Sequence, residues 1–216
     1  MPTLRPSFSL GWVILLALVD GVLIGFLTVG AAVALFTDSF DNTDNTFTTL
    51  ACFTGDTGFA DPTAAAADTG GDGDGFELNP TDAFADGGGY ASNIDGAGDR
   101  HRYYSYGFSI SSSCAIEGIE ARLDWWLDDT LGTNSMSVEL SWDGGASWTS
   151  AKTDSIETTT EHTATLGGSA DTWGRTWAVS ELSDANFRVR LTTSSTDGNR
   201  DFFLDWVPVK VYYAAP

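Results

Sequence analysis

The chain has 216 residues, and its 10 Lys and Arg against 30 Asp and Glu give a formal net charge of −20. Because nucleic-acid binding requires cationic side chains that displace counterions from phosphates, so acidic a composition excludes DNA and RNA as partners. The 42 % of hydrophobic residues and the eight Trp suffice for a buried core, which excludes global disorder, and the length suits one domain with additional segments.

The two halves of the chain differ in charge. Residues 1–99 contain one base, Arg5, and fourteen acids, whereas residues 100–216 contain nine bases and sixteen acids. The halves therefore carry −13 and −7. Only the second half has an appreciable number of bases, and some of them, such as Arg188 and Arg190, are interleaved with apolar residues as on a strand.

The N-terminal region consists of a short leader, residues 1–10, and an apolar segment, residues 11–36, whose only charged residue is Asp20. The apolar segment is long enough to cross a bilayer as a helix. Arg5 precedes it, so the positive-inside rule places the N-terminus inside the cell and everything after Phe36 outside. The sequence thus predicts an exported protein that contacts the membrane through an N-terminal helix.

The fate of this segment is open. Ala32-Val33-Ala34 matches a small-residue signal-peptidase site, and cleavage there would release a secreted protein. The apolar stretch is longer than the core of an ordinary signal peptide, which favours an uncleaved anchor. We therefore expect either a membrane-anchored protein at the cell surface or a secreted one.

Residues 11–36 also carry a pattern typical of associating helices. Ala17, Gly21 and Gly25 recur at every fourth position and form a stripe of small residues. Asp20 lies near the middle of the span, where a carboxylate is costly unless it is shielded. These four residues predict self-association, and the layout of leader, apolar helix and exported head is similar to that of a pilin-like subunit.

Residues 37–70 are rich in Thr, Asp, Gly and Ala without a sustained period, as is typical of a solvated spacer. Cys52 lies in this spacer, and Cys114 is the other cysteine of the chain. In an oxidising compartment two thiols of one exported chain most simply pair with each other, so we expect a disulfide that joins the spacer to the following domain. Free cysteines and an intermolecular bridge are the alternatives.

Residues 71–216 alternate between apolar and polar side chains and predict an all-β domain, an antiparallel two-sheet sandwich of jelly-roll type. The residues that share one phase within each expected strand are Tyr104, Tyr106, Phe108 and Ile110; Ile119, Ala121, Leu123 and Trp125; Met136, Val138, Leu140 and Trp142; Phe187, Val189 and Leu191; and Phe203, Asp205, Val207, Val209, Val211 and Tyr213. Loops of Gly, Asp and Ser separate these strands.

Several segments of this domain resemble a known module. They are GDGFELNPTDAFADGGGYA, YGFSI with CAIEGIEARLDWW, LGGSADTWGRTW, ANFRVRL and FFLDWVPVKVYY. In this order they resemble a β-sandwich module that recurs in bacterial secreted and surface proteins and in phage structural proteins, over about residues 70–214. The resemblance implies an extracellular structural or adhesive unit and supplies no catalytic residues. In outline the module is similar to jelly-roll carbohydrate-binding modules, an analogy of architecture only.

No catalytic constellation stands out, and we expect a protein that is not an enzyme. Residues 141–148 resemble the Asp box of sialidases, which folds a hairpin and has no catalytic role. Asp-Thr-Gly triplets at residues 56–58 and 68–70 spell the aspartic-protease motif, but they lie too close in sequence to belong to two lobes. The two histidines, His101 and His162, accompany no nucleophile motif.

Calcium is the one cofactor that the sequence suggests. Asp72, Asp74 and Glu77 place carboxylates, the ligands that Ca²⁺ prefers, on a glycine-rich turn. By analogy with jelly-roll modules that hold a structural ion against an acid of the last strand, Asp205 or Asp201 would complete the site. The alternative is a solvated acidic turn without an ion.

Two aromatic residues are candidates for binding a glycan. Trp126 is out of phase with Trp125, and Tyr103 is out of phase with Tyr104, so within each adjacent pair one ring must lie on the outer face of its strand. Trp and Tyr faces stack on sugar rings. We therefore expect Trp126 and Tyr103 to be exposed.

Three functions follow from these features. The leading hypothesis is a non-enzymatic β-sandwich displayed outside the cell for adhesion or for contact with a surface layer or matrix, with an extracellular glycan or protein as its partner. The alternative is a self-assembling filament subunit that uses residues 11–36. The third is a carbohydrate-binding module.

Overall fold

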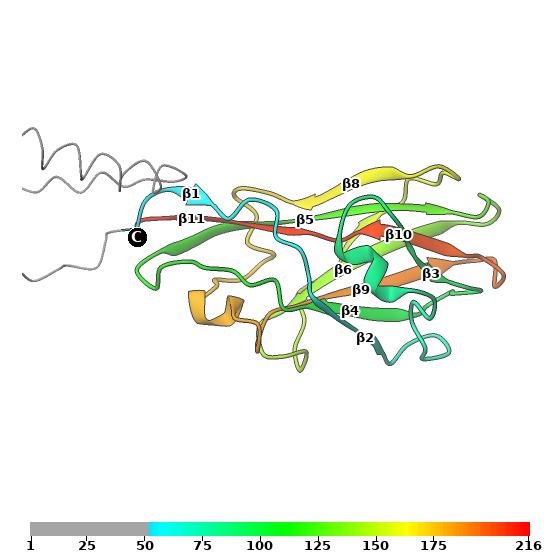
Figure 1. Cartoon of the computed structure of the whole chain (residues 1–216), viewed down its shortest axis with the longest axis horizontal. Helices are drawn as coiled ribbons and strands as arrows, with labels where there is room; N and C mark the ends of the chain where they lie inside the picture. The colour runs from blue at the N-terminus through cyan, green and yellow to red at the C-terminus, as the bar shows by residue number, and fades with distance from the viewer. Residues whose placement is uncertain (1–51) are drawn as a thin grey trace, which may run out of the picture. The chain divides into compact units, whose positions relative to one another are not determined.

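The computed structural model describes residues 52–216, which form two antiparallel β-sheets packed face to face (Figure 1). In chain order the elements are β1 (Gly55–Asp56), β2 (Ala64–Asp68), η1 (Pro80–Phe84), β3 (Ala91–Asn93), β4 (Arg100–Tyr104), β5 (Ala115–Leu127), β6 (Asn134–Ser141), β7 (Lys152–Asp154), β8 (His162–Gly167), η2 (Val179–Leu182), β9 (Arg188–Ser195), β10 (Phe202–Trp206) and β11 (Val209–Ala214), where η1 and η2 are 3-10 helices. The predicted all-β two-sheet sandwich is confirmed.

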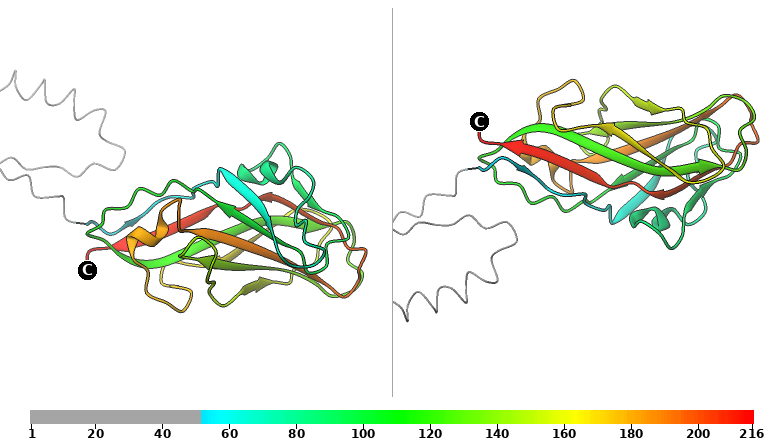
Figure 2. Two further views of the ribbon diagram at one scale, coloured as in Figure 1. Left: turned by 90° about the horizontal axis from the view of Figure 1, so that it is seen from below. Right: turned by 90° about the horizontal axis from the view of Figure 1, so that it is seen from above.

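Sheet A has six strands and is organised around β5, the longest strand. One edge of β5 pairs first with β11 and then with β10, and the other edge pairs with β8. β1 and β3 extend the sheet beyond β11 and β10. Seen from above (Figure 2, right), the green β5 runs beside the red β11.

Sheet B has five strands in the order β2-β4-β9-β6-β7. Its centre is β9, which pairs with β4 on one side and with β6 on the other. Seen from below (Figure 2, left), the cyan β2, the green β4 and the orange β9 lie side by side. The alternating burial along β9 shows that it presents one face to the core and the other to the outside.

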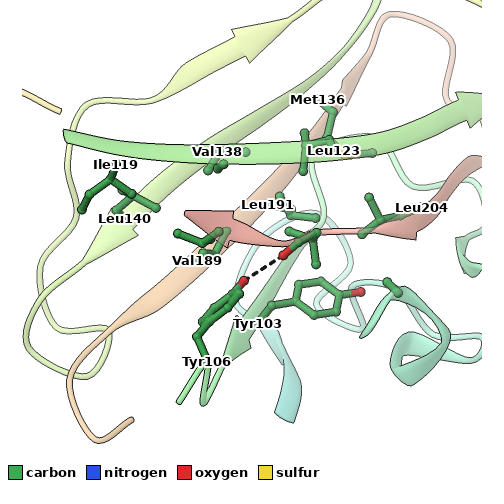
Figure 3. Packing of buried hydrophobic residues seen from close by; sticks show 14 of the residues in the cluster. Tyr103, Tyr106, Ile119, Leu123, Met136, Val138, Leu140, Val189, Leu191 and Leu204 are labelled. Atoms are coloured by element: carbon green, nitrogen blue, oxygen red, sulfur yellow. Dashed lines mark hydrogen bonds between the residues drawn. The ribbon is translucent and has the colours of Figure 1, made fainter. Parts of the chain in front are cut away.

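The core lies between the sheets and includes the apolar residues that alternation predicted for three strands (Figure 3). Side chains with no exposed surface there are Ile119 and Leu123 of β5, Met136, Val138 and Leu140 of β6, and Val189 and Leu191 of β9. Each buried side chain of this size contributes about 1.5 to 3 kcal/mol of transfer free energy. The buried Tyr106 hydroxyl donates to the Val207 carbonyl oxygen at 3.1 Å, which satisfies its polar atom.

The inward and outward faces predicted for residues 103–110 are reversed at the first two residues. β4 ends at Tyr104, and Tyr103 is fully buried while Tyr104 lies outward and is partly exposed. Ser105 then adopts a positive φ of 63°, a conformation that breaks the strand. After this break Tyr106 lies inward as expected, so one unusual backbone residue reversed the inferred faces of the preceding tyrosines.

The phase predicted for the last strand fails in the same way. A register shift between Leu204 and Trp206 marks a bulge opposite β5. Because a bulge inserts one extra residue, the inward residues before it are Phe202 and Leu204, and Phe203 lies on the outer face. Beyond the bulge, Val209 and its neighbours in phase are buried as predicted.

The sandwich begins earlier than residue 71. β1 and β2 both lie within residues 37–70, the range assigned to the spacer, and they pair with β11 and β4 respectively. β2 is a run of four alanines and Asp68, and alanine carries little β-propensity. Its sequence therefore resembles a linker, although its backbone completes an edge of sheet B.

The predicted disulfide is present. Cys52 and Cys114 are bonded to each other, with their Cα atoms 5.1 Å apart. The bond links the start of the described chain to the residue before β5. Disulfides persist in oxidising compartments, which is consistent with an exported protein.

The leader and the apolar segment lie outside the described residues. This applies to the membrane helix or signal segment at 11–36 and to the helix-association residues Ala17, Asp20, Gly21 and Gly25. Within residues 52–216 no helix is both long enough and apolar enough to cross a membrane.

The expected turn at residues 141–148 is confirmed as a structural element. The Asp143 carboxylate accepts the Ser147 N–H at 2.8 Å, and the Ser141 hydroxyl accepts the Gly145 N–H at 2.9 Å. Gly144 and Gly145 have positive φ values of 78° and 101°, which glycine adopts without strain.

Candidate functional site

The outer face of sheet A is built by the alternation of β5. Because Leu123, Trp125 and Leu127 face the core, the side chains of the residues between them point toward the outer face of the sheet. Asp124 and Trp126 are thereby placed beside the outward residues of β8 and β10, the two strands that flank this part of β5.

Three aromatic side chains meet on this face and are called the aromatic cluster: Tyr90, Trp126 and Phe203. Trp126 and Phe203 are register partners, with ring centroids 5.5 Å apart. Tyr90, in the loop before β3, packs edge-on against both rings at 5.0 and 5.3 Å. Tyr90 is 46 % exposed and the other two rings are partly exposed, so the outside of sheet A carries an accessible aromatic surface.

Three carboxylates gather beside these rings and are called the carboxylate cluster: Asp86, Asp124 and Glu161. One oxygen of each lies within 4.8 Å of the others. Glu161 directly precedes His162, the register partner of Trp125, which places it next to Trp126 across the β5–β8 pair. Asp86 comes from the loop that leads to Tyr90. Three distant segments therefore supply one acidic group next to the aromatic cluster.

Asp205 borders the carboxylate cluster. Its Oδ2 accepts the Gly87 N–H at 2.8 Å, which fixes the 85–90 loop over sheet A. Burial and the nearby charges of Asp86 and Asp124 raise the pKa of Asp205. Burial, together with the charges of Asp205, Asp124 and Asp86, likewise raises the pKa of Glu161. The site therefore concentrates negative charge.

Arg122 compensates part of this charge. Its guanidinium donates to both carboxylate oxygens of Asp124, at 2.9 and 2.6 Å, and this pairing raises the pKa of Arg122. The same guanidinium lies 4.7 Å from the ring centroid of Trp206. Asp124 is fully buried and has both oxygens occupied, so Asp86 and Glu161 are the exposed acceptors of the cluster.

Aromatic faces beside fixed acceptors form a combination suited to sugars. The rings offer apolar contact for the C–H face of a pyranose, and carboxylate oxygens accept hydrogen bonds from its hydroxyls. Trp126, predicted to bind glycans, lies in this cluster. Tyr103, the other predicted glycan residue, is fully buried in the core, and that expectation is corrected.

The residues predicted to bind calcium are only partly brought together. Asp72 and Asp74 form a group with Asp99, in which one oxygen of each lies within 4.8 Å of the others. Glu77 Oε1 instead accepts the Ile94 N–H at 2.8 Å, and Asp205 belongs to the outer face of sheet A. Of the four predicted residues, Asp72 and Asp74 therefore lie together, with Asp99 as their third neighbour, while Glu77 and Asp205 lie outside this group.

Asp99 organises this acidic turn. Its Oδ1 accepts the Asp72 N–H at 2.9 Å, and a Cβ at Gly71 would lie only 1.7 Å from that oxygen. Gly71 has a φ of +55°, so both space and backbone conformation require glycine there. A hydrogen bond with Asp72 is the main cause that raises the pKa of Asp74 to about 6. Asp99 is separated from the turn in sequence, and no local pattern marks it.

His101 supports the same turn from the core. Its Nδ1 accepts the Phe76 N–H at 3.1 Å, which requires that nitrogen to be unprotonated. Burial, followed by the charge of Arg102, lowers the pKa of His101 to about 4. The imidazole is therefore neutral near pH 7 and has a structural role.

Comparisons with known proteins give distant structural matches only. No family model and no curated protein matches the chain. One similar solved structure is the Clostridium thermocellum N-terminal endo-1,4-beta-D-xylanase 10B, CBM22-1–GH10 modules complexed with xylohexaose, at 15 % identity and a TM-score of 0.37, covering 74 % of this chain and 26 % of that one. Another is CBM35 from Cellvibrio japonicus Abf62, at 16 % identity and a TM-score of 0.35, covering 71 % and 90 %. The chain thus spans about a quarter of the xylanase structure, and matches at this level carry no functional information.

Proposed function

We propose that the sandwich is a non-catalytic glycan-binding domain of an exported protein and that its ligand binds on the outer face of sheet A. The observation that carries this proposal is the aromatic cluster of Tyr90, Trp126 and Phe203 directly beside the carboxylate cluster. Adhesion to a glycan-bearing surface or matrix is the cellular role that such binding would serve.

Each part of the face has a distinct task in this proposal. The Trp126 ring, supported by Phe203 and Tyr90, stacks on a sugar ring. Asp86 and Glu161 accept hydrogen bonds from ring hydroxyls at one side of the stack. Because Arg122 holds Asp124, the floor of the site is fixed before the ligand arrives, which lowers the ordering cost of binding.

The test is a glycan array with the full-length chain, followed by calorimetry with the tightest ligand. Trp126→Ala should weaken binding at least about tenfold, since stacking on an aromatic ring is lost. Trp142→Ala is the matched control, because Trp142 is also partly exposed but packs against Arg175, which belongs to neither cluster. Equal affinity of the two variants for the glycan would show that the binding site does not lie on the outer face of sheet A. Release of shorter sugars from the bound glycan would show an enzyme instead.

We also propose that Asp72, Asp74 and Asp99 hold a structural calcium ion. The support is their convergence, since three carboxylate oxygens within 4.8 Å of one another are the hard donors that Ca²⁺ prefers. A bound cation would offset the repulsion between Asp72 and Asp74.

A further inference from the structure

The outer face of sheet B concentrates arginines. Arg100 and Arg102 lie on β4, and Arg188 and Arg190 lie on the neighbouring β9. They are outward because they alternate with buried residues such as His101 and Val189. Arg102 and Arg190 are register partners, and Arg188 is the partner of Tyr104. Four of the ten bases of the chain therefore occupy adjacent positions on one face, the arginine face.

The arginine face is only partly neutralised. Glu139 pairs with Arg190 at 2.7 Å, and Asp68 lies 3.5 Å from Arg190 and 3.9 Å from Arg102. Within residues 52–216, Arg100 and Arg188 form no ion pair. The charge of Asp184 also acts on Arg188, so four guanidiniums stand against three carboxylates, and the face keeps an excess of positive charge on a chain whose formal charge is −20.

The two unpaired guanidiniums are held by neutral groups. Arg188 donates to the carbonyl oxygens of Asp184, Phe187 and Ala185 at 2.6 to 3.0 Å, and Arg100 donates to that of Thr69 at 3.3 Å. Carbonyl oxygens fix a guanidinium without cancelling its charge.

Aromatic and small residues frame the arginines. The Arg188 guanidinium lies 4.4 Å from the centroid of Tyr104, and that of Arg190 lies 4.1 Å from the Trp148 ring. These contacts orient the planar cations, as bidentate recognition of carboxylates requires. The cross-strand neighbours include Ala66, opposite Arg102, and Thr192, opposite Arg100. The Arg102 side chain is 32 % exposed, whereas that of Arg190 is 13 % exposed, so Arg102 is the more accessible of these two.

We infer that the arginine face is a second binding surface, specific for a polysaccharide that carries carboxylates, such as a polyuronate. Carboxylates match the oriented guanidiniums. Hydroxyl groups match the Ser and Thr side chains that continue the face, among them Ser137 and Thr192, which are register partners of β6 and β9. The inference does not depend on the sheet A site, which lies on the opposite sheet.

The test is binding of the full-length chain to polygalacturonate, with uncharged dextran as the reference. Arg102→Gln should weaken polygalacturonate binding at least about tenfold at about 50 mM NaCl, and raising the salt to about 300 mM should weaken the wild type as well, because exposed charges are screened. Lys210→Gln is the matched control: it removes one positive charge from the outer face of sheet A and should change affinity less than about twofold.

Three outcomes would overturn the inference. One is absence of polygalacturonate binding at low salt. Another is an equal loss in Arg102→Gln and Lys210→Gln, which would indicate a response to net charge alone. The third is equally tight binding of a single-stranded oligonucleotide, which would make the surface a general polyanion site. Thermal melts of both variants confirm that they are folded, and Trp126→Ala should retain polygalacturonate binding.

Discussion

The two sheets are alike on their inner faces and different on their outer faces. Inside, β5 of sheet A and β9 of sheet B both present aliphatic side chains with no exposed surface. Outside, sheet A carries the aromatic and carboxylate clusters, whereas sheet B carries the arginine face. The inner pattern holds the sandwich together by apolar burial, which is insensitive to charge. The outer faces are therefore where two different ligand chemistries can be placed on one fold.

The difference also changes the meaning of the net charge. The formal −20 describes the whole chain, but the described domain separates its charges by face. Acidic groups collect on sheet A and on the turn around Asp99, whereas four arginines collect on sheet B. Local surfaces of either sign determine which partners dock, and the overall charge affects mainly long-range approach.

The largest contrast between the faces is expected from removing one arginine of each. Arg122→Met leaves Asp124 fully buried without its bidentate partner and should cost about 3 kcal/mol of unfolding free energy. Arg190→Met exposes Glu139 and Asp68, which already have some contact with water, and should cost about 1 kcal/mol. Urea unfolding of both variants measures the difference. Equal losses of unfolding free energy in the two variants would contradict the expectation that the more deeply buried ion pair is the more costly one to break.

The second contrast is between the two histidines and concerns the loss of stability at low pH. The pKa of His101 is lowered from 6.5 to about 4, so below pH 6.5 the unfolded chain takes up a proton that the folded chain does not. This contribution to stability is fully present above pH 6.5 and is lost as the pH falls to about 4, by up to about 3 kcal/mol. His101→Gln should flatten the fall in melting temperature between pH 7 and pH 4. In the control His162→Gln the fall in melting temperature should persist. If the fall is flattened in His162→Gln instead, the loss of stability in acid comes from His162 and not from His101.

Much of the inner face could be predicted from sequence, and the outer sites could be predicted only in part. Alternation identified Leu123 and Val189 because every second side chain of a strand lies on the same face, so the face toward the core is apolar at every second residue. It failed at Tyr103 and Phe203, where the positive φ of Ser105 and the bulge near Asp205 shift the phase without an evident sequence signal. Trp126 was predictable because an adjacent pair of tryptophans must place one outside.

The acidic groups show a different limit of the sequence. Asp86, Asp124 and Glu161 meet because the 85–90 loop crosses the outside of sheet A and β8 pairs with β5. Asp99 meets Asp72 because the residues before β4 return to the glycine-rich turn. Such convergence depends on topology, so local spacing could suggest Asp72 and Asp74 but not their third partner.

The smallest expected effect is stabilisation by Ca²⁺, and it distinguishes the acidic turn around Asp99 from the carboxylate cluster on sheet A. If Ca²⁺ binds at Asp72, Asp74 and Asp99, millimolar Ca²⁺ should raise the melting temperature by a few degrees, since a ligand at about 10 times its Kd adds about 1.4 kcal/mol. Asp99→Asn should abolish that rise, because it removes the oxygen charge at the buried side of the turn. Glu161→Gln is the matched control, as it removes one charge from the carboxylate cluster and should leave the response unchanged. A rise that disappears in Glu161→Gln and persists in Asp99→Asn would move the ion to sheet A, and it would make the sugar site there dependent on calcium.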